Sequence, residues 1–155
     1  MVQTNPTKVQ TNPKMVQTNQ GNPEKPVPNF KNEVAAHPGG ERVLNCFLCG
    51  TCTAGCPISE LTDDYNPRRI MRKILAGMRD EVLGGAEIWK CYQCHNCVAH
   101  CPQDVRFADV IRALREMAEA EGFREAELSV KIAELDLAAR KKLLQDIESL
   151  LADNP

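Results

Sequence analysis

A regular three- or four-residue spacing of apolar side chains marks the stretch that follows Asn66. Asn66 and Pro67 are typical of a helix N-cap with proline in the first turn, and Gly84 with Gly85 is typical of a helix end. Between them, one apolar stripe contains Ile70, Met71, Ile74, Leu75, Met78 and Val82. This stripe predicts one continuous helix. The opposite face, expected to be solvated or to meet an acidic partner, carries Arg68, Arg69, Arg72, Lys73 and Arg79.

Two more apolar stripes predict two further helices. The first contains Phe107, Val110, Ile111, Leu114, Met117 and Ala118. The second, from about Glu125 to Leu151, contains Leu128, Ile132, Leu135, Ala139, Leu143, Ile147 and Leu150. The sequence leaves open whether this last helix covers the core or docks to another protein of a complex, because its apolar face must be buried against something. No alternating apolar pattern is present, which predicts an all-α fold.

The first 28 residues differ in composition from the rest of the chain. The motif Val-Gln-Thr-Asn recurs at residues 2–5, 9–12 and 16–19, and the segment contains five prolines, which exclude a continuous helix. Its Gln, Thr and Asn residues bury too little apolar area to offset chain entropy, so we expect a disordered tail that a partner could order. The predicted domains are 1–32 (low-complexity tail), 33–122 (core) and 123–155 (C-terminal helical extension for docking).

All eight cysteines fall into two copies of one run. The first copy contains Cys46, Cys49, Cys52 and Cys56, followed by Pro57. The second contains Cys91, Cys94, Cys97 and Cys101, followed by Pro102. This spacing is typical of proteins that hold two [4Fe-4S] clusters, in which the fourth cysteine of each run ligates the other cluster.

The expected ligand sets are therefore crossed. One cluster is expected on Cys46, Cys49, Cys52 and Cys101. The other is expected on Cys91, Cys94, Cys97 and Cys56. Each half then depends on the other, so we expect one cooperative unit that does not fold without iron and sulfide. The second set is expected to have the higher potential because its loop carries more hydrogen-bond donors, unless solvent exposure and partner charges dominate.

Two other uses of cysteine fit this pattern less well. Disulfide frameworks belong mainly to secreted chains, and no apolar signal segment is seen at the N-terminus. Structural zinc usually takes two short cysteine pairs separated by a longer stretch. Thiols kept for clusters imply a reducing compartment, most simply the cytoplasm.

Composition narrows the function further. The formal net charge of -2 gives no indication of nucleic acid binding, and no run approaches the roughly 20 apolar residues that span a bilayer, so no direct membrane insertion is expected. No phosphate loop or nucleophile motif is present, and no catalytic residue is predicted. We expect His95 and His100 to be polar neighbours of a cluster rather than ligands, and Trp89 to be a core or interface anchor.

Several of these features together resemble the C subunit of heterodisulfide reductase, over about residues 40–122. They are the paired cysteine runs, a helical spacer opened by Asn66 and Pro67, Trp89 two residues before Cys91, and a following helix. The resemblance implies an alpha-helical ferredoxin with two [4Fe-4S] clusters. The repetitive tail has no counterpart in this family pattern.

The resemblance also implies a function and partners. In this family, the C subunit relays electrons from a flavin-containing A subunit to a B subunit whose Cys-Cys-Gly domains cleave a disulfide. In methanogens that disulfide joins coenzyme M and coenzyme B, and related assemblies use other sulfur substrates. A hydrogenase or formate dehydrogenase can join the larger complex. The chain is thus expected to be a non-catalytic part of an oxidoreductase.

Alternative functions remain open at this point. The chain could be a free, diffusible dicluster ferredoxin, although a soluble carrier usually shows a strongly acidic surface. It could also be the iron-sulfur subunit of another dehydrogenase or fumarate-reductase-like complex. A structural zinc protein would be colourless.

Overall fold

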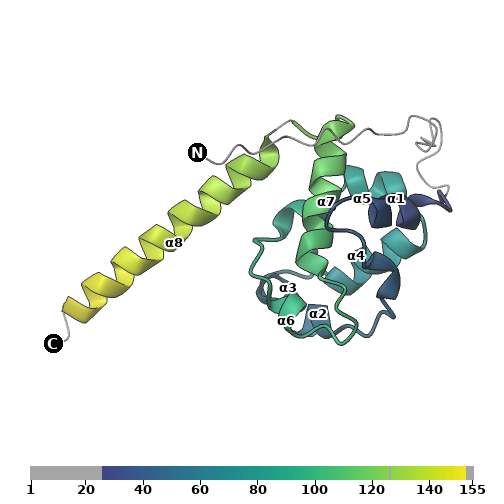
Figure 1. Cartoon of the computed structure of the whole chain (residues 1–155). Coiled ribbons are helices and arrows are strands. Elements are labelled where there is room, and N and C mark those ends of the chain that lie inside the picture. The colour runs from purple at the N-terminus through teal and green to yellow at the C-terminus, as the bar shows by residue number, and fades with distance from the viewer. Residues whose placement is uncertain (1–25, 126, 153–155) are drawn as a thin grey trace, which may run out of the picture.

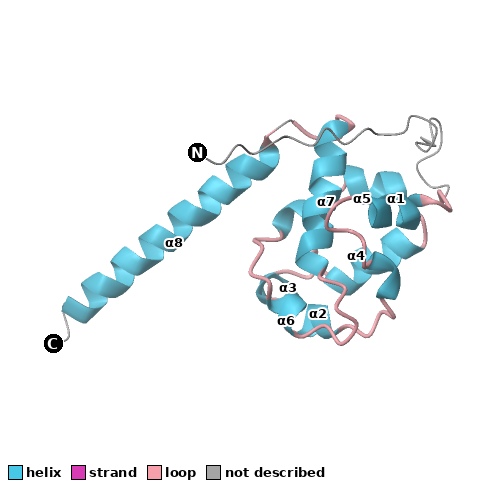
Figure 2. Cartoon of the chain, in the orientation of Figure 1, coloured by secondary structure: helices cyan, strands magenta, loops and turns pink. Residues whose placement is uncertain are grey.

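The computed structural model describes residues 26–125 and 127–152, and the repeats of the expected tail lie outside them. Within the described ranges all regular structure is helical (Figure 2), which confirms the all-α prediction. In chain order the elements are α1 (Phe30–Ala36), η1 (Val43–Asn45), α2 (Thr51–Ala54), α3 (Pro57–Leu61), α4 (Pro67–Leu75), α5 (Arg79–Gly84), η2 (Glu87–Lys90), α6 (Asn96–Ala99), α7 (Phe107–Ala120) and α8 (Leu128–Ala152).

The spacer between the cysteine runs forms two helices, so the prediction of one continuous helix was wrong. It starts as expected, because the Asn66 side chain accepts a hydrogen bond from the Arg69 backbone N–H at 3.0 Å. The break lies at Gly77, whose φ of +78° ends α4. Here the Val27 N–H donates to the Gly77 carbonyl at 2.7 Å, and a Cβ on Gly77 would lie 2.4 Å from the Val27 carbonyl oxygen. A close backbone crossing therefore requires glycine at this point.

Helix α7 organises the core, since it contacts α1, α5, α6, η2 and α8 (Figure 1). Every member of its predicted apolar stripe is buried. From α4 and α5, the buried members of the predicted stripe are Ile70, Met71, Ile74 and Val82. The two stripes pack around Phe30 and Val34 of α1, which were not assigned to a helix from sequence. With Val27 also buried, the packed core reaches upstream of the expected boundary at residue 33.

Arg79 lies inside this core and not on a solvated face, so that expectation was wrong. Its side chain is only 2% exposed. It donates to Glu33 of α1 at 2.8 Å and forms a second short ion pair with Glu121 after α7, and its guanidinium lies 5.9 Å from the Phe30 ring centroid. One arginine thus joins three elements, and burial of its charge is compensated by two carboxylates.

Replacing Arg79 by Met is expected to destabilise the core by about 3 kcal/mol, because two partly buried carboxylates lose their cation. For a packed region of this size, 1 kcal/mol changes the melting temperature by about 4–8 °C, so we expect a fall of more than about 10 °C. The matched control is Arg112→Met, because Arg112 is 54% exposed and its ion pairs with Asp109 and Glu116 are both 3.8 Å long. That change is expected to cost less than about 1 kcal/mol. Equal melting temperatures for the two variants would contradict this account.

Helix α8 leaves the core after α7 and projects away from it (Figure 1). Its half-buried residues, Leu128, Ser129, Ile132 and Asp136, all lie in its first three turns. The exposed large apolar residues beyond Asp136 are Leu137, Leu143, Leu144, Ile147, Leu150 and Leu151. The helix is therefore no cover over the core.

Candidate metal centres

The two cysteine runs fold as two copies of the same local structure. Each follows a 3-10 turn, and the first cysteines have nearly identical backbones: φ −72°, ψ 119° at Cys46 and φ −72°, ψ 122° at Cys91. Each run then passes through a left-handed residue, Gly50 (φ 93°) or His95 (φ 60°), directly before the short helix α2 or α6. The repeat in the sequence is thus a repeat in three dimensions, and α2 and α6 contact one another.

A first cavity lies inside the loop of the first run. The thiols that line it are Cys46, Cys49, Cys52, Cys97 and Cys101. Four of these form the first predicted ligand set, and Cys97 lies at the border with the second site. Backbone N–H groups point at two of the four sulfurs: Leu48 donates to Cys46 Sγ and Val105 donates to Cys101 Sγ, both at 3.4 Å. Such donors stabilise negative charge on sulfur.

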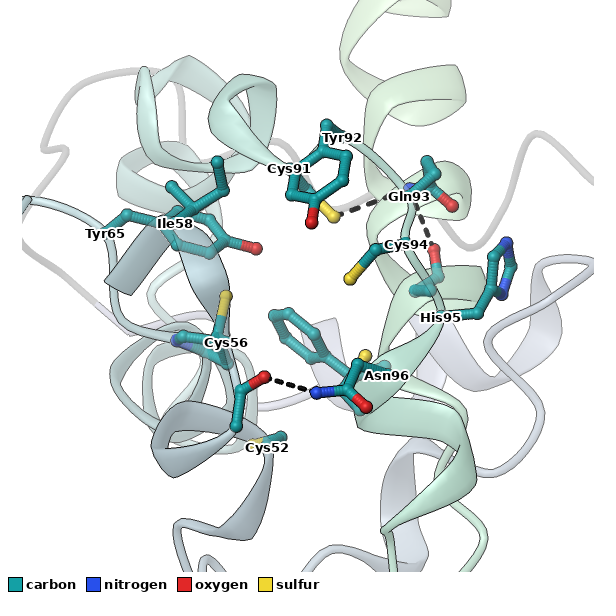
Figure 3. A pocket seen from close by; sticks show the side chains of 15 residues that line it. Cys52, Cys56, Ile58, Tyr65, Cys91, Tyr92, Gln93, Cys94, His95 and Asn96 are labelled. Atoms are coloured by element: carbon teal, nitrogen blue, oxygen red, sulfur yellow. Dashed lines mark hydrogen bonds between the residues drawn. The ribbon is translucent and has the colours of Figure 1, made fainter. Parts of the chain in front are cut away.

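A second cavity lies inside the loop of the second run (Figure 3). The thiols of the second predicted set, Cys56, Cys91, Cys94 and Cys97, meet here. Tyr65 is 2% exposed, and its hydroxyl points into the cavity and hydrogen-bonds Cys91. The Gln93 amide donates to the Ala108 carbonyl at 3.1 Å and lies 3.8 Å from Cys91 Sγ. The structure therefore brings the first three cysteines of each run together with the fourth cysteine of the other.

The two cavities adjoin. Cys52, Cys97 and Phe107 line both of them. The loops are tied across this boundary by the Asn96 side chain, which donates to the Gly55 carbonyl. In the described part of the chain, no three His, Cys, Asp or Glu side chains are grouped so that they could hold a single metal ion. The thiols instead surround two neighbouring spaces.

Two half-buried thiols, Cys52 and Cys97, need nearby positive charge to ionise near neutral pH. Burial raises the pKa of Cys52 to about 11 and that of Cys97 to about 12. Exposed Cys49 differs, because the hydrogen bond from the Thr51 hydroxyl lowers its pKa. Thiolates are the form that binds iron, and iron cations offset the cost of burying them. Four soft sulfur donors around each apolar-walled space therefore fit an iron-sulfur cluster.

Two residues beside the second cavity were missed from the sequence. Tyr65 lies outside the apolar stripes, and nothing in its neighbours marks it. Arg115 is 6% exposed, and it carried a signal, because it lies four residues after Ile111 and three before Ala118, on the apolar face of α7. A charged residue at the spacing of an apolar stripe indicates a buried charge with a particular role.

The two histidines of the second run are exposed, whereas Trp89 is half-buried. His95 is exposed at the rim of the second cavity, and His100 is exposed after α6. Trp89 is half-buried against the core, its ring lies 5.6 Å from the Arg115 guanidinium carbon, and its indole N–H has no hydrogen-bond partner. Its packing against the core and its position two residues before Cys91 make it a structural neighbour of the second loop.

Comparison with known proteins first gives the class of domain. Residues 42–105, which contain both loops and the thiols of both cavities, match the 4Fe-4S dicluster domain. This part of the chain is therefore an iron-sulfur domain. No helix in the part of the chain that the structure describes has the length and apolarity needed to cross a bilayer.

Curated relatives then narrow the class. The chain is 36% identical over 104 residues to the C subunit of the H(2):CoB-CoM heterodisulfide,ferredoxin reductase of Methanothermobacter thermautotrophicus, a match that covers 67% of this chain and 54% of the relative. It is 39% identical over 103 residues to an iron-sulfur C subunit of the CoB--CoM heterodisulfide reductase of Methanocaldococcus jannaschii, covering 61% and 53%. For the iron-sulfur C subunit of Methanopyrus kandleri the identity is 41% over 86 residues, covering 54% and 44%. The resemblance to the C subunit of heterodisulfide reductase is thereby confirmed, and the chain spans about half the length of these relatives.

Proposed function

We propose that this chain is a non-catalytic electron-transfer subunit of a heterodisulfide reductase complex and holds two [4Fe-4S] clusters. One cluster binds Cys46, Cys49, Cys52 and Cys101. The other binds Cys56, Cys91, Cys94 and Cys97. The observation that carries the proposal is the pair of adjoining cavities, each of which gathers one of these sets of four thiols. When bound, the clusters supply one-electron transfer.

The residues of the chain set the path that electrons take. Cys52 and Cys97 border both cavities, so they place the two sites next to each other. Cys49 and Cys94 are the exposed cysteine of each set. Each site therefore has one edge at the surface and one edge toward its neighbour, as a two-step relay between two partners requires.

The relatives support a choice of partners. Their printed names assign them to CoB-CoM heterodisulfide reductases. We infer that this chain receives electrons from a flavin-containing A subunit and passes them to a B subunit with Cys-Cys-Gly domains, where a coenzyme M–coenzyme B heterodisulfide or a related sulfur substrate is cleaved. A hydrogenase or formate dehydrogenase in the larger complex is compatible with this role. Cysteines kept reduced for clusters point to the cytoplasm.

Helix α8 is the proposed docking element for these partners. Six large apolar side chains beyond Asp136 are exposed, and an amphipathic helix of this kind gains stability by burying its apolar side in a partner groove. Every residue from Leu137 to Ala152 is exposed, so this length of α8 presents its surface to a partner and not to the core.

Anaerobic purification of the chain under native conditions tests the proposal. We expect about eight iron and about eight sulfide per chain, the content of two four-iron clusters. We also expect a flavoprotein and a Cys-Cys-Gly protein to co-purify. A monomer with two intact clusters and no partner would contradict the subunit role and favour a free ferredoxin. A colourless protein with zinc would contradict the cluster assignment itself.

A further inference from the structure

Arg115 is a buried cation directly behind the second cysteine loop. Its side chain projects from the middle of α7, and the residue is 6% exposed. Its hydrogen bonds go to backbone carbonyls of one short segment. Nε donates to Ile88 O at 2.9 Å, and Nη2 donates to Trp89 O at 3.1 Å and to Cys91 O. The guanidinium thus fixes the four-residue stretch from which Cys91 enters the cavity.

The charge of Arg115 is not compensated by a carboxylate contact. Among the described residues no Asp or Glu forms an ion pair with it, and the one carboxylate that acts on it electrostatically is half-exposed Glu119, one turn along α7. The other buried arginine, Arg79, is held between Glu33 and Glu121. A buried cation without a counter-ion is costly unless negative charge lies nearby. The sulfur-rich second cavity is the place where such charge collects.

The first cavity has no buried counterpart among the described residues that line it. Its arginine, Arg68, lines the cavity and donates from Nε to Leu48 O at 2.7 Å, so it contacts the first loop much as Arg115 contacts the second. However, Arg68 is exposed. Water and salt screen its charge, whereas the field of a buried guanidinium is screened far less. The two sites therefore have similar thiols but different fixed charge.

We propose that Arg115 is a positioning residue that orients the Cys91 loop and raises the reduction potential of the cluster in the second cavity. This inference rests on the proposed function. Reduction adds one negative charge to a cluster whose thiolate ligands already make it anionic, and a nearby buried cation stabilises the reduced form more than the oxidised form. Arginine stays protonated at all relevant pH values, so the effect is a constant bias.

Redox titration of the full-length, cluster-loaded chain tests the inference. In Arg115→Gln the midpoint potential of the second cluster is expected to fall by at least the equivalent of a tenfold change in its one-electron reduction equilibrium, about 59 mV. The midpoint of the first cluster is expected to stay unchanged. Arg115→Lys, which keeps the charge, is expected to retain most of the wild-type potential. The signals are assigned with Cys94→Ser and Cys49→Ser, which alter the second and the first cluster, respectively.

A purely structural role would lower the cluster content of Arg115→Gln without moving a potential. Two assembled clusters with both midpoints unchanged would overturn the inference. If Arg115→Gln assembles only the first cluster, Arg115→His decides the matter, because its imidazole carries the charge at low pH and loses it as the pH rises through about 6.5. A midpoint of the second cluster that falls over this pH range by more than that of the first supports the inference, and an equal pH dependence of both midpoints overturns it. A wild-type chain without a second cluster overturns the proposed function and this inference with it.

Discussion

Cys56→Ala is expected to damage the cluster of the second loop, although Cys56 belongs to the first run of the sequence. Cys56 lines the cavity that also contains Cys91, Cys94 and Cys97. With one ligand missing, that cluster is expected to lose one iron or to be lost entirely. The iron content should fall from about eight to between about four and about seven per chain, with the first cluster intact.

Double variants show which cluster each cysteine ligates. If Cys56 and Cys94 bind the same cluster, the double variant Cys56→Ala/Cys94→Ala still keeps about four irons, because only one site is affected. In Cys56→Ala/Cys49→Ala both sites lack a ligand, so neither four-iron cluster should stay intact, and at most about six irons should remain per chain. The matched variant Cys101→Ala should resemble Cys49→Ala. Retention of an intact second cluster in Cys56→Ala/Cys49→Ala would show that the ligand sets are not crossed.

The sequence was sufficient for the features that depend on local spacing. The three- and four-residue periods predicted the buried faces of α4 and α7 because a helix that packs on one side must repeat with this period. The cysteine spacing predicted which thiols would meet, because a short loop can surround one cluster but its fourth cysteine lies too far along the chain. These features need no knowledge of distant contacts.

Other features depend on contacts between distant segments. Gly77 breaks the spacer helix because Val27 crosses it, and nothing near Gly77 in the sequence announces that crossing. Arg79 belongs to a basic face by its spacing, but Glu33 and Glu121 are 46 and 42 residues away along the chain. Tyr65 similarly depends on a distant partner, because its buried hydroxyl hydrogen-bonds Cys91. Buried polar groups are placed by their tertiary partners, which a helical period does not encode.

These contacts also divide the chain into two regions that should respond differently to loss of iron. The cluster region consists of the two loops with α2, α3 and α6, and none of these three helices has a buried residue. At four or five residues they are far below the roughly 12 residues at which isolated helices become marginal. The core region is formed by α1, α4, α5 and α7, whose apolar side chains bury one another.

Removal of iron with a chelator is therefore expected to unfold the cluster region while α7 and its neighbours keep much of their structure. The binding free energy of a structural metal, about 10–16 kcal/mol for zinc sites, is as large as the whole stability of a domain, so loops that depend on it have no fold without it. Hydrogen exchange measures the loss of structure separately in each region of the chain. Backbone amides of residues 46–66 and 91–104 should lose protection by at least about 100-fold, or roughly 2.7 kcal/mol.

Amides in the middle of α7 serve as the internal control, because Val110, Ile111 and Leu114 are fully buried and line neither thiol cavity. Their protection is expected to fall much less than that of the loops. Arg79→Met should remove this difference, because it weakens the core that would otherwise persist without iron. If the wild-type chain instead loses protection equally in α7 and in the loops, the clusters and the core form one cooperative unit, as the interlocked cysteine sets alone would suggest.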